Sequence, residues 1–123
     1  MNISKIANLK FFYTNTRKIS CYMSFFVMIL FIIGIYWGLF IAPEDYLQGN
    51  SYRIMYVHVP SAWLASFLYL SLAISCIFYL VWKHPLADLI SSSIAPIGVL
   101  FSLLTLITGS LWGKPMWGTW WVW

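Results

Sequence analysis

The stretch that decides the fold is CYMSFFVMILFIIGIYWGLFIA, residues 21–42, which contains no charged side chain. Two further uncharged runs follow it: WLASFLYLSLAISCIFYLVW at residues 63–82 and LISSSIAPIGVLFSLLTLITGSL at residues 89–111. A helix needs about 20 predominantly apolar residues to cross the hydrocarbon layer of a membrane, so each run is long enough to span it. The sequence therefore predicts an all-α, polytopic membrane helix bundle with three transmembrane helices.

The composition of the chain supports this class. Of its 123 residues, 62% are hydrophobic and only 8% are charged. About a quarter of the residues of a soluble globular domain are charged, so this chain has too few charges to cover a water-soluble core. We expect a single membrane domain over residues 1–123, with an outer loop at 43–62 and an outer tryptophan-rich segment at 112–123.

The basic residues predict the orientation of the spans. Those before the first span and between the second and third would share one side of the membrane: Lys5, Lys10, Arg17, Lys18 and Lys83. Only Arg53 and Lys114 would lie on the other side. Because the more basic side of a membrane protein usually faces the cytoplasm, we expect a cytoplasmic N-terminus and outer tryptophans.

Few side chains are suited to catalysis. The only carboxylates are Glu44, Asp45 and Asp88, and none lies inside a predicted span. The sequence shows no nucleophile–base arrangement and no glycine-rich phosphate loop, which excludes a Walker-type ATPase or a hydrolase for this chain. Proton pumping is also disfavoured because the spans lack ionisable Asp, Glu, His, Lys and Arg. We expect a protein that is not an enzyme.

The loop before the second span has helical periodicity. From residue 51, apolar side chains recur at i, i+3, i+4 and i+7: Tyr52, Met55, Tyr56 and Val59. This pattern predicts a short helix lying in the membrane interface. Pro60 should end that helix, and Ser61 should cap the span that follows.

The tryptophan-rich segment and the three residues before it form the most distinctive motif. Residues 109–123 read GSLWGKPMWGTWWVW and hold five of the eight tryptophans. Trp117, Trp120 and Trp121 stand at i, i+3 and i+4, which predicts a helical turn with three indoles on one face, and Trp123 repeats the spacing from Trp120. Clustered indoles suit the apolar surface of a partner protein, a quaternary ammonium ligand, or a planar macrocycle.

A porphyrin fits this segment better than a cation does. Lys114 lies within the cluster and no acid does, which disfavours a cationic ligand. Haem has two flat faces for stacking, an iron that takes an axial imidazole, and anionic propionates that Lys114 would meet. His58, in YVHVPSAW at residues 56–63, is predicted on the same side and at the same depth as the tryptophans. His84, on the other side, is interpreted as a solvated loop histidine.

These motifs resemble a known family. Residues 109–123 closely resemble the tryptophan-rich WWD signature of the haem-handling membrane proteins of cytochrome c maturation. GKPM at residues 113–116 favours the CcmC branch, haem exporter protein C, over the related CcmF and CcsA types. The YVHVPSAW segment is similar to that family's first outer-loop histidine segment.

The resemblance implies a six-span protein that holds haem b non-covalently at the outer face, between two axial histidines and the WWD platform. His58 matches the first of these histidines. It also implies transfer of haem to the haem chaperone CcmE, beside the ABC-transporter subunits CcmA and CcmB. The implied location is the bacterial inner membrane, with the mitochondrial inner membrane as the alternative. The second histidine, the motif's Asp and three spans have no counterpart here, so we expect the N-terminal half of such a protein.

The predicted site combines His58, as the axial ligand of the haem iron, with residues of the tryptophan-rich segment: Trp112, Gly113, Lys114, Trp117, Gly118, Trp120, Trp121 and Trp123. Gly113 and Gly118 would let the backbone approach the macrocycle closely. Two alternatives stay open. The chain would be a haem-free membrane anchor whose aromatic tail docks a partner, or an inactive N-terminal fragment with weak haem binding.

Overall fold

The computed structural model describes residues 9–121, except for the side chains at positions 9, 11, 12, 15 and 18. The described chain is helical: α2 (Leu9–Tyr36) runs into a π-helical turn η1 (Trp37–Ile41), and a 3-10 helix η2 (Asn50–Ile54) leads into α3 (Met55–Trp82) and α4 (Pro85–Trp117). Three stretches are long and apolar enough to cross a membrane: Ile19–Ile41, Asn50–Trp82 and Pro85–Trp117. The prediction of an all-α membrane protein is therefore confirmed.

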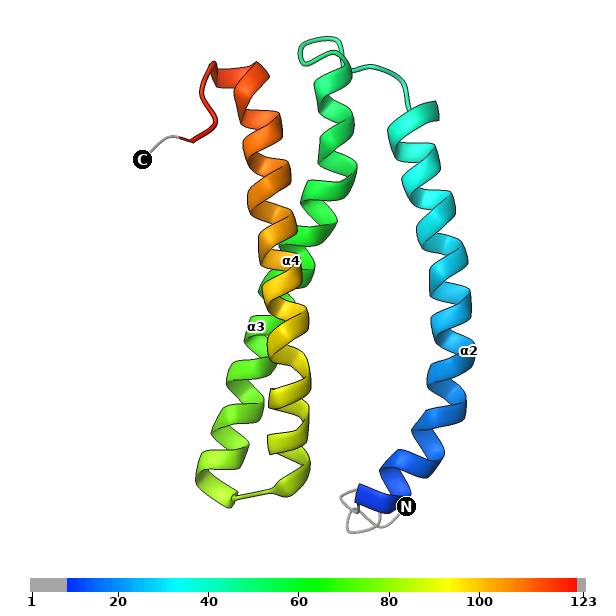
Figure 1. Cartoon of the computed structure of the whole chain (residues 1–123), viewed down its shortest axis with the longest axis vertical. Helices are drawn as coiled ribbons and strands as arrows, with labels where there is room; N and C mark the ends of the chain where they lie inside the picture. Colours follow the sequence, from blue (N-terminus) through cyan, green and yellow to red (C-terminus); the bar gives the residue numbers. More distant parts are fainter. Residues whose placement is uncertain (1–8, 122–123) are drawn as a thin grey trace.

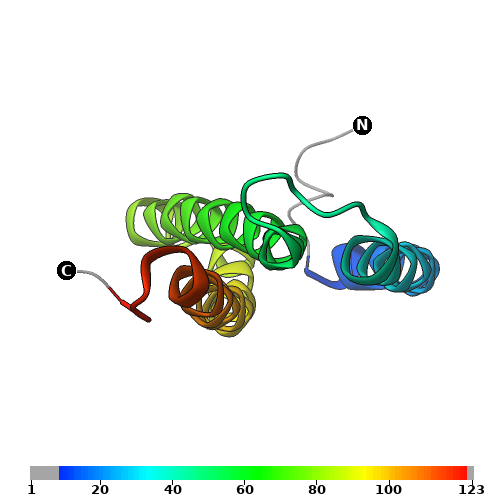
Figure 2. The same cartoon turned by 90° about the horizontal axis from the view of Figure 1, so that it is seen from above.

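Helices α3 and α4 form an antiparallel pair, and α2 stands apart from this pair along most of its length (Figures 1 and 2). The start of α2 and the α3–α4 turn lie at one end of the molecule, which we call the His84 end (Figure 1). The 42–49 loop, η2 and the C-terminal part of α4 lie at the opposite end, the His58 end. The chain thus alternates between the two ends as the three apolar runs predict.

The turn at the His84 end is shorter than the six residues, 83–88, that separate the second and third uncharged runs. Lys83 adopts a left-handed conformation with φ of 51°, and its N–H donates to the Tyr79 carbonyl oxygen at 2.8 Å. His84 is the N-cap residue of α4, where its Nδ1 accepts from the Leu86 N–H at 3.3 Å. Pro85 follows at the first position of the helix, where no amide hydrogen is needed. His84 is therefore a half-buried capping residue rather than a simple solvated loop histidine.

The prediction that Pro60 ends a short interfacial helix is wrong. Helix α3 is continuous from Met55 to Trp82 and contains Pro60, so no break separates the two predicted segments. Ser61 does not cap a helix but donates from its hydroxyl to the Val57 carbonyl oxygen at 2.7 Å. A proline costs one backbone hydrogen bond, whereas ending the helix there would leave several polar groups unpaired in apolar surroundings.

The three helical segments converge at the His58 end. Gly38 of η1 is buried against Tyr56 of α3, and a Cβ on this glycine would lie 2.9 Å from the Tyr56 Cβ. Arg53 of η2 donates from Nη2 to the Ala42 carbonyl oxygen at 2.9 Å. Most large apolar side chains of the bundle instead face outward. This distribution is typical of helices that pack through small residues and expose their apolar faces to lipid.

Candidate functional site

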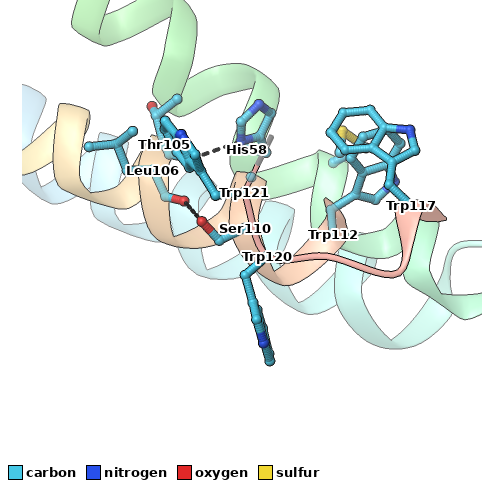
Figure 3. A pocket seen from close by; sticks show the side chains of 10 residues that line it. His58, Thr105, Leu106, Ser110, Trp112, Trp117, Trp120 and Trp121 are labelled. Atoms are coloured by element: carbon cyan, nitrogen blue, oxygen red, sulfur yellow. Dashed lines mark hydrogen bonds between the residues drawn. The ribbon is translucent and has the colours of Figure 1, made fainter. Parts of the chain in front are cut away.

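A cavity of about 420 Å³ opens at the His58 end, between the N-terminal part of α3 and the C-terminal part of α4 (Figure 3). Its walls come from both helices and from the segment after α4: Met55, His58, Thr105, Leu106, Gly109, Ser110, Trp112, Trp117, Trp120 and Trp121. Its volume lies in the range of about 300–1,000 Å³ that is common for small-molecule sites. The cavity is mostly apolar, with one imidazole in its wall.

The His58 imidazole is held through its Nδ1 atom. Nδ1 lies 3.1 Å from the Thr105 carbonyl oxygen and 3.1 Å from the Thr108 Oγ1. A carbonyl oxygen only accepts hydrogen bonds, so the contact with Thr105 is a hydrogen bond in the tautomer that carries its hydrogen on Nδ1. Within residues 9–121 no hydrogen bond engages Nε2, and in a neutral imidazole this second nitrogen then holds the lone pair that binds a metal. His58 is half-buried, so the ring sits in the wall of the cavity rather than free in solvent.

Two of the indoles lie against each other. The rings of Trp112 and Trp117 are 5.0 Å apart between centroids and nearly perpendicular, at 81°. The Trp120 indole points in a different direction in Figure 3. The side chains of Trp117 and Trp120 are more than half exposed. The indoles therefore form an angled wall rather than one flat platform.

The prediction of a helical turn through Trp117, Trp120 and Trp121 is wrong beyond its first residue. Helix α4 ends at Trp117, because Gly118 adopts a left-handed conformation with φ of 74° and its N–H donates to the Lys114 carbonyl oxygen at 3.0 Å. Glycine at this position is a common helix stop. The chain after Gly118 leaves the helix axis, so Trp120 and Trp121 reach the cavity from a non-helical segment.

Lys114 is engaged locally. Its Nζ donates to the Gly118 carbonyl oxygen at 2.9 Å and lies 5.7 Å from the centroid of the Trp120 ring. Gly113 is buried beneath Trp117, where a Cβ would meet the indole Cε3 at 3.4 Å. Both residues thus shape the last turn of α4, adjacent to the cavity. Trp123 lies outside the described residues.

A hydrogen bond joins the tryptophan-rich segment to the loop between α2 and α3. The indole Nε1 of Trp112 donates to the Gln48 Oε1 at 2.8 Å. Gln48 is itself held in a turn, in which its backbone N–H donates to the Asp45 Oδ1 at 2.8 Å. One wall of the cavity is therefore attached to the 42–49 loop.

Comparison with known proteins identifies the family. The sequence profile of CcmC, described as heme exporter protein C, matches residues 2–123. This chain belongs to the CcmC family. It is 53% identical over 106 residues to heme exporter protein C of Haemophilus influenzae, covering 86% of this chain and 43% of that protein. The match to the Bradyrhizobium diazoefficiens protein of the same name is 44% identical over 123 residues, covering 100% of this chain and 46% of the relative.

A eukaryotic relative is also similar. The putative cytochrome c biosynthesis ccmC-like mitochondrial protein of Marchantia polymorpha is 52% identical over 98 residues, which cover 80% of this chain and 43% of that protein. The chain thus spans less than half the length of these curated relatives. The family resemblance that the tryptophan-rich segment and the His58 segment carry is confirmed.

In this member of the CcmC family, the structure brings together part of the predicted site. His58, Trp112, Trp117, Trp120 and Trp121 line one cavity. Gly113, Lys114 and Gly118 flank that cavity without lining it. Sequence reasoning missed the α4 residues that face the imidazole: Thr105, Thr108 and Gly109. Their i, i+3 and i+4 spacing placed them on one face of the third span, but it did not show that His58 is opposite that face.

Proposed function

We propose that this chain is a haem-handling component of cytochrome c biogenesis that binds haem non-covalently at the His58 end. The observation that carries the proposal is an imidazole held through Nδ1, with Nε2 available, in the wall of a cavity lined by four indoles. A neutral imidazole nitrogen is a common axial ligand of haem iron, and indoles contact a flat apolar ring well. The family's name, heme exporter protein C, supports the same ligand.

Each predicted site residue has a role in this proposal. His58 supplies the axial ligand to the iron of haem b. Apolar contacts to the macrocycle come from five indoles: Trp112, Trp117, Trp120, Trp121 and Trp123. Gly113 and Gly118 shape the backbone between them. Lys114 meets a propionate by exchanging its bond to the Gly118 carbonyl oxygen for a charge-assisted one. The chain binds and hands on haem without catalysing bond chemistry.

The wider role follows from the family. We propose that the protein acts in the bacterial inner membrane, with its N-terminus in the cytoplasm, and passes haem to the haem chaperone CcmE beside CcmA and CcmB. Three helices able to span a membrane and the basic residues near the His84 end support this arrangement. The His58 end, with the cavity, then faces outward.

Haem ligation by this chain alone should be incomplete. The chain has two histidines: His58 lies in the first turns of α3, and His84 caps the start of α4, at the opposite end of this helix pair (Figure 1). Within this chain, His58 is therefore the only imidazole at the cavity. We expect weak haem binding with one axial imidazole rather than a bis-imidazole spectrum.

A haem titration tests the proposal. The purified chain in lipid nanodiscs is titrated with haemin while the Soret band is recorded, for the wild type, His58→Ala and the control His84→Ala. We expect saturable shifts in the wild type and the control and their loss in His58→Ala. An identical shift in His58→Ala would remove this residue from the ligand role. Purification of a stoichiometric protein partner without haem, lost in Trp120→Ala, would instead favour the membrane-anchor alternative.

A further inference from the structure

We propose that Thr108 is a positioning residue for His58: its hydroxyl, together with the Thr105 carbonyl oxygen, holds the imidazole with its hydrogen on Nδ1 and so reserves Nε2 for an iron-centred ligand. This inference rests on the proposed function for the identity of that ligand. The arrangement of hydrogen bonds around the ring does not depend on it.

The Thr108 hydroxyl is fixed as an acceptor toward the imidazole. Its own hydrogen has acceptors within α4, the Leu104 carbonyl oxygen at 2.6 Å and, at a longer 3.3 Å, the Thr105 carbonyl oxygen. The lone pairs of Oγ1 are therefore left for the Nδ1–H of His58, 3.1 Å away. If the hydroxyl donated to Nδ1 instead, the Nδ1 lone pair would face the Thr105 carbonyl oxygen at 3.1 Å, which is repulsive. Both acceptors thus select the same tautomer.

The ring is also fixed in space. Gly109 lies beside it, so that a Cβ there would come within 3.0 Å of the His58 Cε1. Thr105, Thr108 and Gly109 follow one another along one face of α4 and meet the imidazole from α3. Two acceptors and a close backbone contact together leave the ring little freedom to rotate.

The partners of this imidazole carry no charge. Metal-bound histidines often donate to a carboxylate, which raises the basicity of the ligand. Here the carboxylates at the same end are engaged elsewhere: Glu44 accepts from the Asn50 amide, and Asp45 accepts from the Leu47 and Gln48 backbone. Asp88 lies in the first turn of α4, at the other end. A neutral carbonyl and hydroxyl orient His58 and strengthen its donation less than a carboxylate would, which suits a protein that must release its ligand.

The test compares two variants at Thr108 with a control variant at a threonine away from the cavity. Thr108→Val removes the acceptor with little change of shape, and Thr108→Ser keeps it. Thr14→Val is the matched control, because the Thr14 hydroxyl likewise donates to a carbonyl oxygen four residues earlier, that of Lys10 at 2.9 Å, but lies in α2 and does not line the cavity. Retained helical circular dichroism shows that each variant is folded.

The first measurement needs no haem. Nitrogen-15 NMR of labelled histidine in nanodiscs reports which imidazole nitrogen carries the hydrogen. We expect hydrogen on Nδ1 of His58 in the wild type, Thr108→Ser and Thr14→Val, and a smaller share of this tautomer in Thr108→Val. Hydrogen predominantly on Nε2 in the wild type, or an unchanged tautomer ratio in Thr108→Val, would overturn the assignment.

The second measurement is haem affinity with the reduction potential of the bound haem. Loss of a hydrogen-bond partner of a metal ligand typically weakens metal binding about tenfold or more. We therefore expect Thr108→Val to bind haem about tenfold more weakly than the wild type. The serine and control variants should bind haem with near wild-type affinity. The potential should rise in Thr108→Val, because the imidazole donates less charge. If the wild type and Thr108→Val had the same haem affinity and the same reduction potential while His58→Ala bound no haem, the positioning role of Thr108 would be contradicted and the proposed function would not. Haem binding that survives His58→Ala would contradict the proposed function instead, while the tautomer result would still stand.

Discussion

Gly109 of α4 lies so close to His58 of α3 that a methyl group on this glycine would be 3.0 Å from Cε1 and 3.4 Å from Nδ1 of the imidazole. The contact joins the two helices at the cavity and sets how near the ring lies to its acceptors on α4. A glycine within the tryptophan-rich motif thus has a packing role that concerns the histidine rather than the indoles.

Gly109→Ala should displace the imidazole. The added methyl group cannot be accommodated without a shift of the ring or of α4, so the hydrogen bonds of Nδ1 lengthen. We expect haem affinity to fall about tenfold, as for other disturbances of a ligand's orientation. Haemin titration measures the loss. Gly34→Ala is the control, because a Cβ there meets nothing within 4 Å, and an equal loss in both variants would argue against this contact.

Gly38→Ala should separate η1 from α3. A Cβ at position 38 would lie 2.9 Å from the Tyr56 Cβ, and neither backbone can yield without moving a helix. Overpacking of this kind costs about 1–3 kcal/mol of unfolding free energy. Unfolding in mixed micelles measures the change. Gly38→Ala should cost less stability in a Tyr56→Gly background, which lacks the Tyr56 Cβ, than in the wild type, and an equal cost in both backgrounds would contradict the proposed clash.

Trp112→Phe should loosen the loop between α2 and α3. The variant removes the indole N–H that donates to Gln48, while leaving an aromatic ring in the wall of the cavity. One such hydrogen bond contributes about 1 kcal/mol. Hydrogen exchange should become faster within residues 44–50. Trp63→Phe, at an exposed position on α3, should leave exchange in that loop unchanged; slower or equal exchange in Trp112→Phe would oppose a tethering role.

Gly118→Ala should destabilise the end of α4. The φ of 74° at this position is costly for a residue with a Cβ, by about 1–2 kcal/mol. Gly118→Asn should cost less, because asparagine tolerates the left-handed conformation at helix ends. Unfolding free energies of the two variants give the comparison. Equal costs for alanine and asparagine would indicate that the backbone conformation is not the cause.

Lys114→Gln should weaken haem binding modestly. The exposed ammonium group would lose its charge-assisted bond to a propionate, and exposed ion pairs contribute less than about 1 kcal/mol, which corresponds to a two- to fivefold change. The loss should shrink in high salt because exposed charges are screened. Lys83→Gln, at the His84 end, is the control for net charge. An equal effect of both substitutions would contradict a local role of Lys114.

Much of the fold was predictable because a membrane imposes strong rules on sequence. The uncharged runs 21–42, 63–82 and 89–111 each had to form a helix, since only a helix satisfies its own backbone in lipid. Helix ends were harder to predict. Pro60 reads as a stop in a soluble helix but lies inside α3, and Trp117 reads as the start of a turn but ends α4.

The sequence by itself determined the class, the three apolar helices, the family and the pairing of a histidine with a tryptophan-rich segment. These depend on composition, run length and short motifs, which are properties of neighbouring residues. Only the tertiary structure decided how His58 is held. Its partners Thr105, Thr108 and Gly109 are far away in sequence, and they meet the ring because α3 and α4 pack in one register. That register depends on small-residue contacts along two helices, which no local pattern specifies.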